Sequence, residues 1–170
     1  LWLNDDLGPH TDGPLAVTID TGAALTACGI EIDAANVNNS GTFSDANAFA
    51  SELYGLTGTI NAFNNAGTYN KQNNTVTTVG ATFNNTGVTN INAGTMYLTN
   101  GGTSTGTFNI ADGAKLNLAG GTHNLNNATT SGAGTLAISG GSVILNNVST
   151  SGTGALAISG GSVALNGGTH

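Results

Sequence analysis

The feature that most constrains the fold of this chain is an internal repeat, with a period of about 20 residues, at its C-terminal end. The segment SGAGTLAISGGSVILNNVST (131–150) is followed by SGTGALAISGGSVALNGGTH (151–170), and 13 of the 20 aligned positions are identical. The residues at 111–130 follow the same pattern of apolar and glycine positions. Periods of this length are typical of solenoids, in which each repeat buries its apolar face against the next. The repeat therefore predicts a stacked, elongated fold.

Each repeat is built from strands. Residues 136–138 and 143–145 alternate between inward and outward positions with a period of two, and Gly140 and Gly141 supply a corner between them. No part of the repeat has the i, i+4 spacing of an apolar helix face. Since a parallel crossover is right-handed by default, we predict an all-β, right-handed parallel β-helix, or β-solenoid, with about 20 residues per coil.

Stepping through the chain one repeat at a time aligns apolar side chains in three columns. The columns are Leu56, Val76, Met96, Leu116, Leu136 and Leu156; Leu98, Leu118, Ile138 and Ile158; and Phe43, Phe63, Phe83, Thr103, His123, Val143 and Val163. We expect Leu116, Leu136 and Leu156 to stack directly over one another in a parallel ladder. His123 is expected to be an inward or rim-facing member of its column.

The composition fits side chains stacked coil on coil. Charged residues make up 6% of the chain, whereas it holds 27 Gly, 24 Asn and 26 Thr. Stacked like charges repel, while stacked amides and hydroxyls can hydrogen-bond to one another. The pairs at 64–65, 84–85, 126–127 and 146–147 are candidate asparagine ladders. An equally good interpretation is exposed turns, in which asparagine tolerates a left-handed backbone.

The solenoid is expected to span residues 15–170, and residues 1–14 to be a linker or an N-terminal cover. Residues 44–55 exceed the repeat, and Phe49 and Leu53 lie at i, i+4, which predicts a protruding loop or short helix. The spacing from Asn84 to Asn126 is two periods plus two residues. It predicts a short insertion near residues 101–102 or near Gly106.

The charges argue against several classes of partner. Eight of the nine acidic residues lie in the first 52, and arginine is absent, so the chain lacks the cationic groups that bind phosphates. We expect no nucleic-acid partner. Because no apolar run approaches about 20 residues, we expect no membrane insertion of this segment. The single cysteine, Cys28, is read as a small buried residue.

Few residues suggest a chemical site, and we predict no catalytic, cofactor-binding or metal-binding residues and no enzyme activity. Asn4, Asp5, Asp6 and Asp12 offer oxygen ligands for calcium, but their spacing matches neither an EF-hand loop nor a GGxGxD nonapeptide, so an ordinary solvated acidic end is the favoured interpretation. The histidines His10, His123 and His170 lack the spacing of metal ligands. The repeated Ser142 and Ser162 lack the turn of a nucleophilic serine.

Segments 92–98 (NAGTMYL) and 132–138 (GAGTLAI), with the Asn-Asn-x-Gly-x steps at 64–68 and 84–88, resemble the repeats of large secreted bacterial β-helix proteins. These are the passengers of autotransporters and the filamentous-haemagglutinin-like exoproteins. The resemblance covers roughly residues 15–170. It implies a right-handed parallel β-helix, export to the cell surface, and a role as stalk, adhesin or filament.

The leading hypothesis is a non-enzymatic structural or adhesive segment of an extracellular bacterial surface or filament protein, acting as a stiff stalk. Its partners are expected to be the continuation of its own chain or a second copy stacked end to end, and host or environmental glycans. An alternative is a carbohydrate-binding or ice-binding face built on ranks of Thr57, Thr59, Thr75, Thr77 and Thr95. A polysaccharide-processing β-helix enzyme is the third hypothesis.

Overall fold

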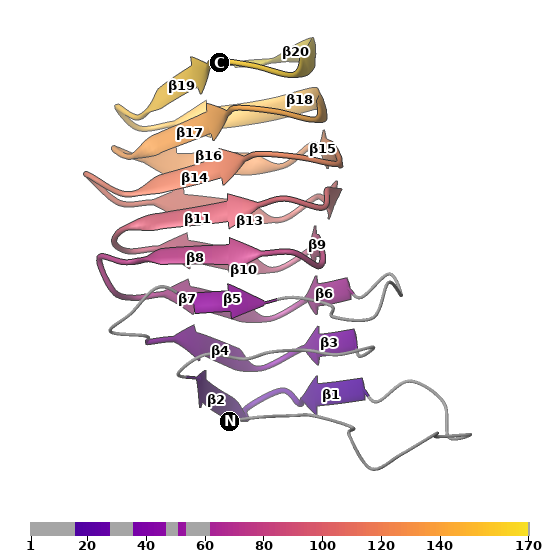
Figure 1. The fold of residues 1–170 in the computed structure, drawn as a ribbon, viewed down its shortest axis with the longest axis vertical. Helices are drawn as coiled ribbons and strands as arrows, with labels where there is room; N and C mark the ends of the chain where they lie inside the picture. Colours follow the sequence, from indigo (N-terminus) through magenta and orange to yellow (C-terminus); the bar gives the residue numbers. More distant parts are fainter. Residues whose placement is uncertain (1–15, 28–35, 47–50, 54–61, 170) are drawn as a thin grey trace.

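A computed structural model describes residues 16–27, 36–46, 51–53 and 62–169. In these ranges the chain is an all-β, parallel β-solenoid of about six turns, with no helix (Figure 1). The predicted fold class is therefore confirmed.

Each complete coil contributes one strand to each of three faces. The first face holds β1 (Ala16–Ile19), β3 (Asn36–Asn39), β6 (Ala62–Asn65), β9 (Thr82–Asn85), β12 (Gly102–Ser104) and β15 (Thr122–Asn126). The second face holds β2 (Ala24–Ala27), β4 (Thr42–Asp45), β7 (Thr68–Lys71), β10 (Val88–Ile91), β13 (Thr107–Ile110) and β16 (Thr129–Gly132). The long strands β18 (Ser142–Ser151) and β20 (Ser162–Thr169) run across both of these faces. The third face holds β5 (Ser51–Leu53), β8 (Val76–Val79), β11 (Thr95–Leu98), β14 (Lys115–Leu118), β17 (Thr135–Ile138) and β19 (Ala155–Ile158).

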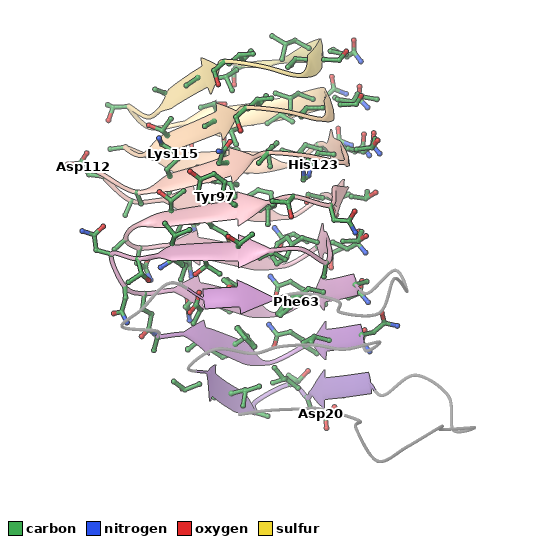
Figure 2. The ribbon with its side chains drawn as sticks, viewed as in Figure 1. Asp20, Phe63, Tyr97, Asp112, Lys115 and His123 are labelled. Atoms are coloured by element: carbon green, nitrogen blue, oxygen red, sulfur yellow. The ribbon has the colours of Figure 1, made fainter. Side chains whose placement is uncertain are left out.

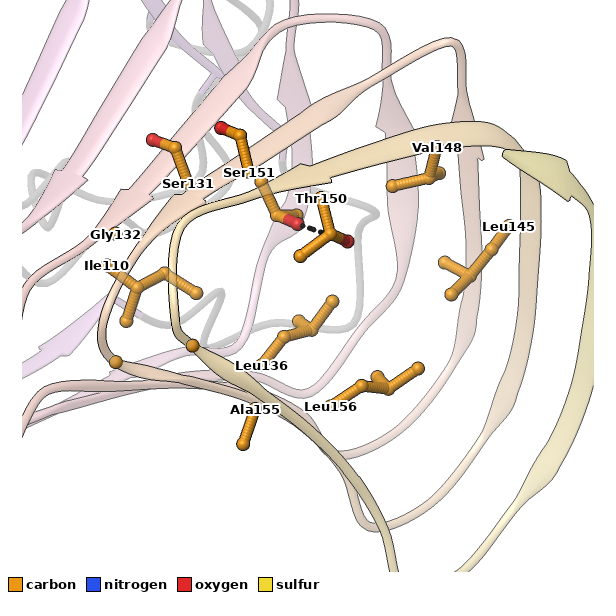
Figure 3. Close-up of a pocket in the computed structure, with 13 residues that line it drawn as sticks. Ile110, Ser131, Gly132, Leu136, Leu145, Val148, Thr150, Ser151, Ala155 and Leu156 are labelled. Carbon is orange, nitrogen blue, oxygen red and sulfur yellow. Dashed lines mark hydrogen bonds between the residues drawn. The ribbon is translucent and has the colours of Figure 1, made fainter. Parts of the chain in front are cut away.

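The coil is right-handed, as expected. In Figure 1 the near strands β8 and β11 run from left to right and the far strands β6 and β7 run from right to left while the chain climbs toward its C-terminus. The view down the axis in Figure 3 gives the same hand, since the chain advances toward the viewer as it turns counterclockwise.

Side chains alternate between the lumen and the outer surface along almost every strand, and the inward ones form the core. Leu116 pairs in register with Leu136, and Leu136 with Leu156, in a parallel ladder. This stack was predicted and is confirmed. The column of Leu98, Leu118, Ile138 and Ile158 is also confirmed.

Two of the predicted columns need correction, one at Val76 and the other at Phe43 and Thr103, while Leu56 lies outside the described residues. Met96 is in register with Thr77, which faces inward and is fully buried, whereas Val76 points outward and is 40% exposed. Counting by the repeat length selected Val76, which is apolar. The step from β8 to β11 is one residue shorter than the repeat, so the count places Val76 one position away from the column.

The column of phenylalanines also divides between two faces. Phe63 is in register with Val37 and Phe83 on the first face, while Phe43 lies on the second face beside Tyr69. Their rings still meet across the lumen, with Phe43 and Phe63 at a centroid distance of 5.2 Å. Further along the first face, Gly102 rather than Thr103 is in register with His123.

The corner between the first and second faces changes form along the chain. In the earlier coils it is tight and depends on glycine, because a Cβ on Gly87 would lie 2.1 Å from the carbonyl oxygen of Gly67. From β15 onward the corner holds one more residue, and Asn127 and Asn147 take a left-handed backbone with φ of 52° and 50°. One extra residue lies at this corner and a second lies between Leu118 and His123, and neither lies near residues 101–102 or Gly106 as predicted. Asn84 corresponds to Thr103 and Asn124, not to Asn126.

The described parts of residues 44–55 belong to the solenoid. Ser44 and Asp45 end β4, and Ser51–Leu53 form β5, which pairs with β8 on the third face. No helix is found in these parts, because Ser51–Leu53 satisfy backbone hydrogen bonds in the sheet. The rest of the segment, and the predicted linker or cover at residues 1–14, lie outside the described residues.

Candidate functional surfaces

A ladder of asparagine side chains runs inside the first coils. Asn39 donates from Nδ2 to Oδ1 of Asn65 at 2.7 Å, and Asn65 donates to Oδ1 of Asn85 at 2.8 Å. All three side chains are buried. Each Nδ2 also donates to a backbone carbonyl of the second face, on Thr68, Val88 and Thr107 respectively. The ladder therefore ties the corner of one coil to the strand of the next.

The inner ladder ends at Asn39. Its Oδ1 is buried and has no hydrogen-bond partner, because Ile19 occupies the register position in the preceding coil. At the other end Ser104 follows Asn85, and Leu125 follows Ser104. The inward side chain at this register position therefore changes along the rod from an amide to a hydroxyl and then to a leucine.

A second buried polar group surrounds Asp45. Thr77 donates a short hydrogen bond from Oγ1 to Oδ2 of Asp45, and the hydroxyl of Tyr69 donates to the same oxygen at 3.4 Å. Burial raises the pKa of Tyr69 well above its ordinary value, and the negative charge of Asp45 raises it further. Tyr69 therefore remains a neutral hydrogen-bond donor.

Lys71 lies beside Asp45 in the parallel ladder of the second face and is fully buried. Its Nζ donates to the carbonyl oxygen of Asn73 at 2.5 Å and to Oγ1 of Thr75 at 3.2 Å. Burial lowers the pKa of Lys71, and Asp45 acts in the opposite direction. These contacts fasten the turn at 72–75 to the second face. Apolar periodicity does not pair Asp45 with Lys71, although their spacing along the chain equals that of Asn38 and Asn64.

His123 faces the lumen, as predicted, and is 2% exposed. Gly102 and Val143 flank it in register, and neither of them titrates. Its Nε2 has no hydrogen-bond partner. Burial lowers the pKa of His123, and contacts with the backbone of Gly120 and Leu98 act in the opposite direction. The ring is therefore held neutral in an apolar column.

We expect His123 to make the fold sensitive to acid. The folded state has the lower pKa, so the unfolded state binds more protons below the ordinary value of about 6.5, and stability falls as the pH drops through that value. The slope approaches at most about 1.4 kcal/mol per pH unit. Substitution H123V, the residue found one coil later at Val143, should abolish this part of the slope. Urea unfolding between pH 8 and pH 5 measures it; an equal slope in both proteins would contradict the assignment to His123.

Asparagine ladders also run along the outer surface, and they include the candidates Asn64, Asn84, Asn126 and Asn146. Asn84 donates to Asn64 at 2.9 Å and Asn64 to Asn38 at 2.9 Å on the first face. Asn109, Asn90 and Asn70 form a second ladder, and Asn166, Asn146 and Asn126 form a third. Asn127 and Asn147 are both ladder members and exposed turn residues. Nδ2 of Asn147 donates to Oδ1 of Asn127 at 3.5 Å, and both residues have a left-handed backbone. Amides thus bridge successive coils where charges would repel.

The predicted threonine ranks do not form one surface. Thr77 is buried against Asp45, and Thr75 accepts a hydrogen bond from Lys71 in a turn. Thr95 points outward on β11, and Thr57 and Thr59 lie outside the described residues. A different rank exists on the outer side of the second face, where side chains in register are Thr42, Thr68, Val88, Thr107, Thr129 and Ser149.

The exposed carboxylates Asp20 and Asp112 lie far apart. Figure 2 shows Asp20 at the first coil and Asp112 several coils away, both exposed, whereas Asp45 is buried. Among the described residues there is no group of three or more His, Cys, Asp or Glu side chains that could hold a metal ion. Asn4, Asp5, Asp6, His10, Asp12, Cys28 and His170 lie outside the ranges that the structure describes.

The lumen contains a cavity of about 20 Å³ near its C-terminal end. Figure 3 shows it among Ile110, Leu136, Leu145 and Leu156, next to Thr150. The hydroxyls of Thr130 and Thr150 are 3.1 Å apart and bond to each other. This volume holds about one water molecule, so the cavity is a packing defect and not a ligand site.

No protein-family model matches the chain, and no curated protein or solved structure is significantly similar to it. Within the described ranges no helix is long and apolar enough to span a bilayer.

Proposed function

We propose that this chain is a non-enzymatic structural or adhesive segment of an extracellular bacterial surface or filament protein, and that it acts as a stiff stalk. The observation that carries the proposal is the continuity of the ladders. Strands of all three faces pair with the strands above and below in one parallel register, from β6 through β18. A rod with this construction holds whatever lies beyond it at a fixed distance.

The surface chemistry supports a role outside the cell. From residue 62 to residue 169 the chain carries only three charged side chains, Lys71, Asp112 and Lys115, and Lys71 is buried. Outer positions are filled by amides and hydroxyls that bond along the rod. Such a surface leaves few sites for trypsin-like proteases. We also propose that the chain is related to autotransporter passengers or to filamentous-haemagglutinin-like exoproteins, which its repeats resemble.

A deletion of one complete coil tests the stalk role. Removing residues 132–151 joins Ser131 to Gly152, and because Ser131 and Ser151 occupy the same register position the remaining coils should stack without distortion. Small-angle scattering should report a rod shorter by about 4.8 Å. Attachment of cells that display the full chain should stay within about twofold. Duplication of the same coil is the matched control, and loss of attachment on deletion alone would assign a specific site to this coil and contradict the stalk.

The exposed apolar side chains of the last coil support the proposal that a further coil packs on it, either from the continuing chain or from a second copy. Ile158 is 51% exposed and Leu165 is 47% exposed, although Ile138 and Leu145, their register partners one coil earlier, are fully buried. One more coil would cover these side chains and pair with the free edges of β19 and β20.

We expect the isolated segment 1–170 to self-associate end to end. Sedimentation velocity at increasing concentration should show oligomers, and the double variant I158K/L165K should remain monomeric, because lysines on an edge strand oppose pairing. A wild-type segment that stays monomeric at high concentration would contradict this prediction. The matched control is I144K, which changes an apolar residue on the outer side of the first face, away from the edge.

The rank of threonines on the second face favours a second candidate, a face that binds ice or a carbohydrate. The rank is uncharged, and Asn70, Asn90 and Asn109 run beside it. Inhibition of ice recrystallisation by the wild-type segment, lost in T107K, would support the ice-binding form. Absence of inhibition in the wild type would discard it.

A further inference from the structure

The third face carries an unusual group of outward side chains. Thr78, Tyr97 and Asn117 are in register on β8, β11 and β14, and Thr95 and Lys115 are in register beside them. Figure 2 shows Tyr97 and Lys115 on neighbouring strands of the same face. We call this group the Tyr97 surface.

Tyr97 is the one aromatic residue of the described chain whose side chain is not buried. The other described rings line the lumen: Phe43, Phe63, Tyr69, Phe83 and Phe108. An amphipathic ring on the outer side of a sheet, outside the core, is the kind of side chain that dominates recognition surfaces.

The neighbours of Tyr97 supply hydrogen-bonding groups in fixed positions. Asn117 follows Tyr97 in register, is only 6% exposed, and accepts a hydrogen bond from Oγ of Ser139 at 3.0 Å. Thr78 precedes Tyr97, and Thr95 lies two residues before it on the same strand. Because these groups sit on paired strands, their spacing is set by the sheet and no ordering of a loop is required on binding.

The charge of Lys115 favours an anionic ligand for this surface. Lys115 is exposed, the other lysine of the chain is buried, and arginine is absent, so Lys115 is the one cationic side chain at the surface of the described residues apart from histidine. Asp112, in the preceding turn, is the one exposed carboxylate between residues 62 and 169. In the next two coils the outer positions in register with Asn117 are Ala137 and Ala157, and these small side chains leave room for a ligand along the rod axis.

We propose that the Tyr97 surface binds an acidic polysaccharide along the rod axis. One sugar ring stacks on Tyr97, its hydroxyls bond to Thr78 and Thr95, and a carboxylate of the polysaccharide pairs with Lys115. The stalk role does not depend on this site, since none of its five side chains belongs to the lumen.

Affinity electrophoresis of the whole segment in gels containing polygalacturonate tests the proposal, with dextran as the neutral comparison. Polygalacturonate should retard the protein and dextran should not. Y97A should weaken retardation by about tenfold, whereas Y97F, which keeps the ring, should stay within about twofold. K115T, which places the residue of Thr135 at this position, should weaken binding about fivefold and remove its dependence on salt.

T103A on the exposed part of the first face is the matched control and should bind like the wild type. Equal circular dichroism and melting curves of Y97A and wild type establish that the variant is folded. Absence of retardation by polygalacturonate, equal retardation by dextran, or unchanged binding of Y97A would each overturn the proposal. None of these results would alter the scattering of the coil deletion, so the two proposals fail separately.

Discussion

Substitution of Leu116 by asparagine is expected to destabilise the rod more than any other single change considered. Leu116 is fully buried between Met96 and Leu136, its register partners. The variant L116N loses the burial of a leucine and places an amide where no polar group can meet it, at a combined cost of about 4 kcal/mol. Urea unfolding followed by circular dichroism should show the loss as a lower midpoint.

The matched control is I144N, which makes the same kind of change on the outer side of the first face. Ile144 is half-buried, and its register partner in the preceding coil is Asn124, so the chain already places an asparagine at this position. We expect I144N to cost less than about 1 kcal/mol and D112N, at an exposed turn, less than about 0.5 kcal/mol. Equal losses for L116N and I144N would contradict the assignment of inner and outer columns.

Removal of one amide from the inner ladder is expected to have the second-largest effect. Asn65 accepts a hydrogen bond from Asn39 and donates to Asn85 and to the carbonyl of Val88, all inside the rod. The variant N65A leaves the Asn85 Oδ1 and the Val88 carbonyl without this donor in a buried place, which should cost about 3 kcal/mol. Denaturant unfolding again measures it.

Asn90 offers the matched control for burial, because it occupies the same kind of ladder on the outer surface. It donates to Asn70 at 2.8 Å and accepts from Asn109 at 2.7 Å, but water can reach it. We expect N90A to cost about 1 kcal/mol or less, since water replaces the lost partners. A loss for N90A as large as that for N65A would mean that ladder bonds, and not burial, set the energy.

Most of the fold was predictable because one period runs through much of the chain. The stack of Leu116, Leu136 and Leu156 follows directly from a constant repeat length and a two-residue alternation. The inward position of His123 follows from the same spacing. These positions are set by burial, which repeats when the sequence repeats.

The errors occur where a coil is shorter or longer than the repeat. Val76 was assigned to the core because it is apolar, although the shorter step from β8 to β11 turns it outward and brings Thr77 in. Likewise, Phe43 and Phe63 lie one repeat apart in the sequence but on different faces, because the chain from β3 to β6 is longer than one repeat. Insertions at corners shift the register without changing the pattern within each strand.

The buried polar group around Asp45 could not be predicted from apolar periodicity. Apolar periodicity assigns a threonine or an aspartate to the outer surface, and only the partners of such a residue show that it faces inward. Two partners of Asp45, Tyr69 and Thr77, come from two different strands. Tyr97, in contrast, follows from alternation, since its neighbours Met96 and Leu98 are both inward.

The orientation of the strands has a mechanical consequence. Strands run across the rod, so the hydrogen bonds between coils lie along its length and carry tension in series when the ends are pulled. A coil that opens releases about 20 residues, which extend to roughly 70 Å at about 3.5 Å per residue, in place of the roughly 4.8 Å that the coil occupied. The opened coil would therefore span more than ten times the length that it occupied in the rod. Under tension such a rod would extend by opening one coil at a time, and this extension would limit the force on whatever is attached to its ends.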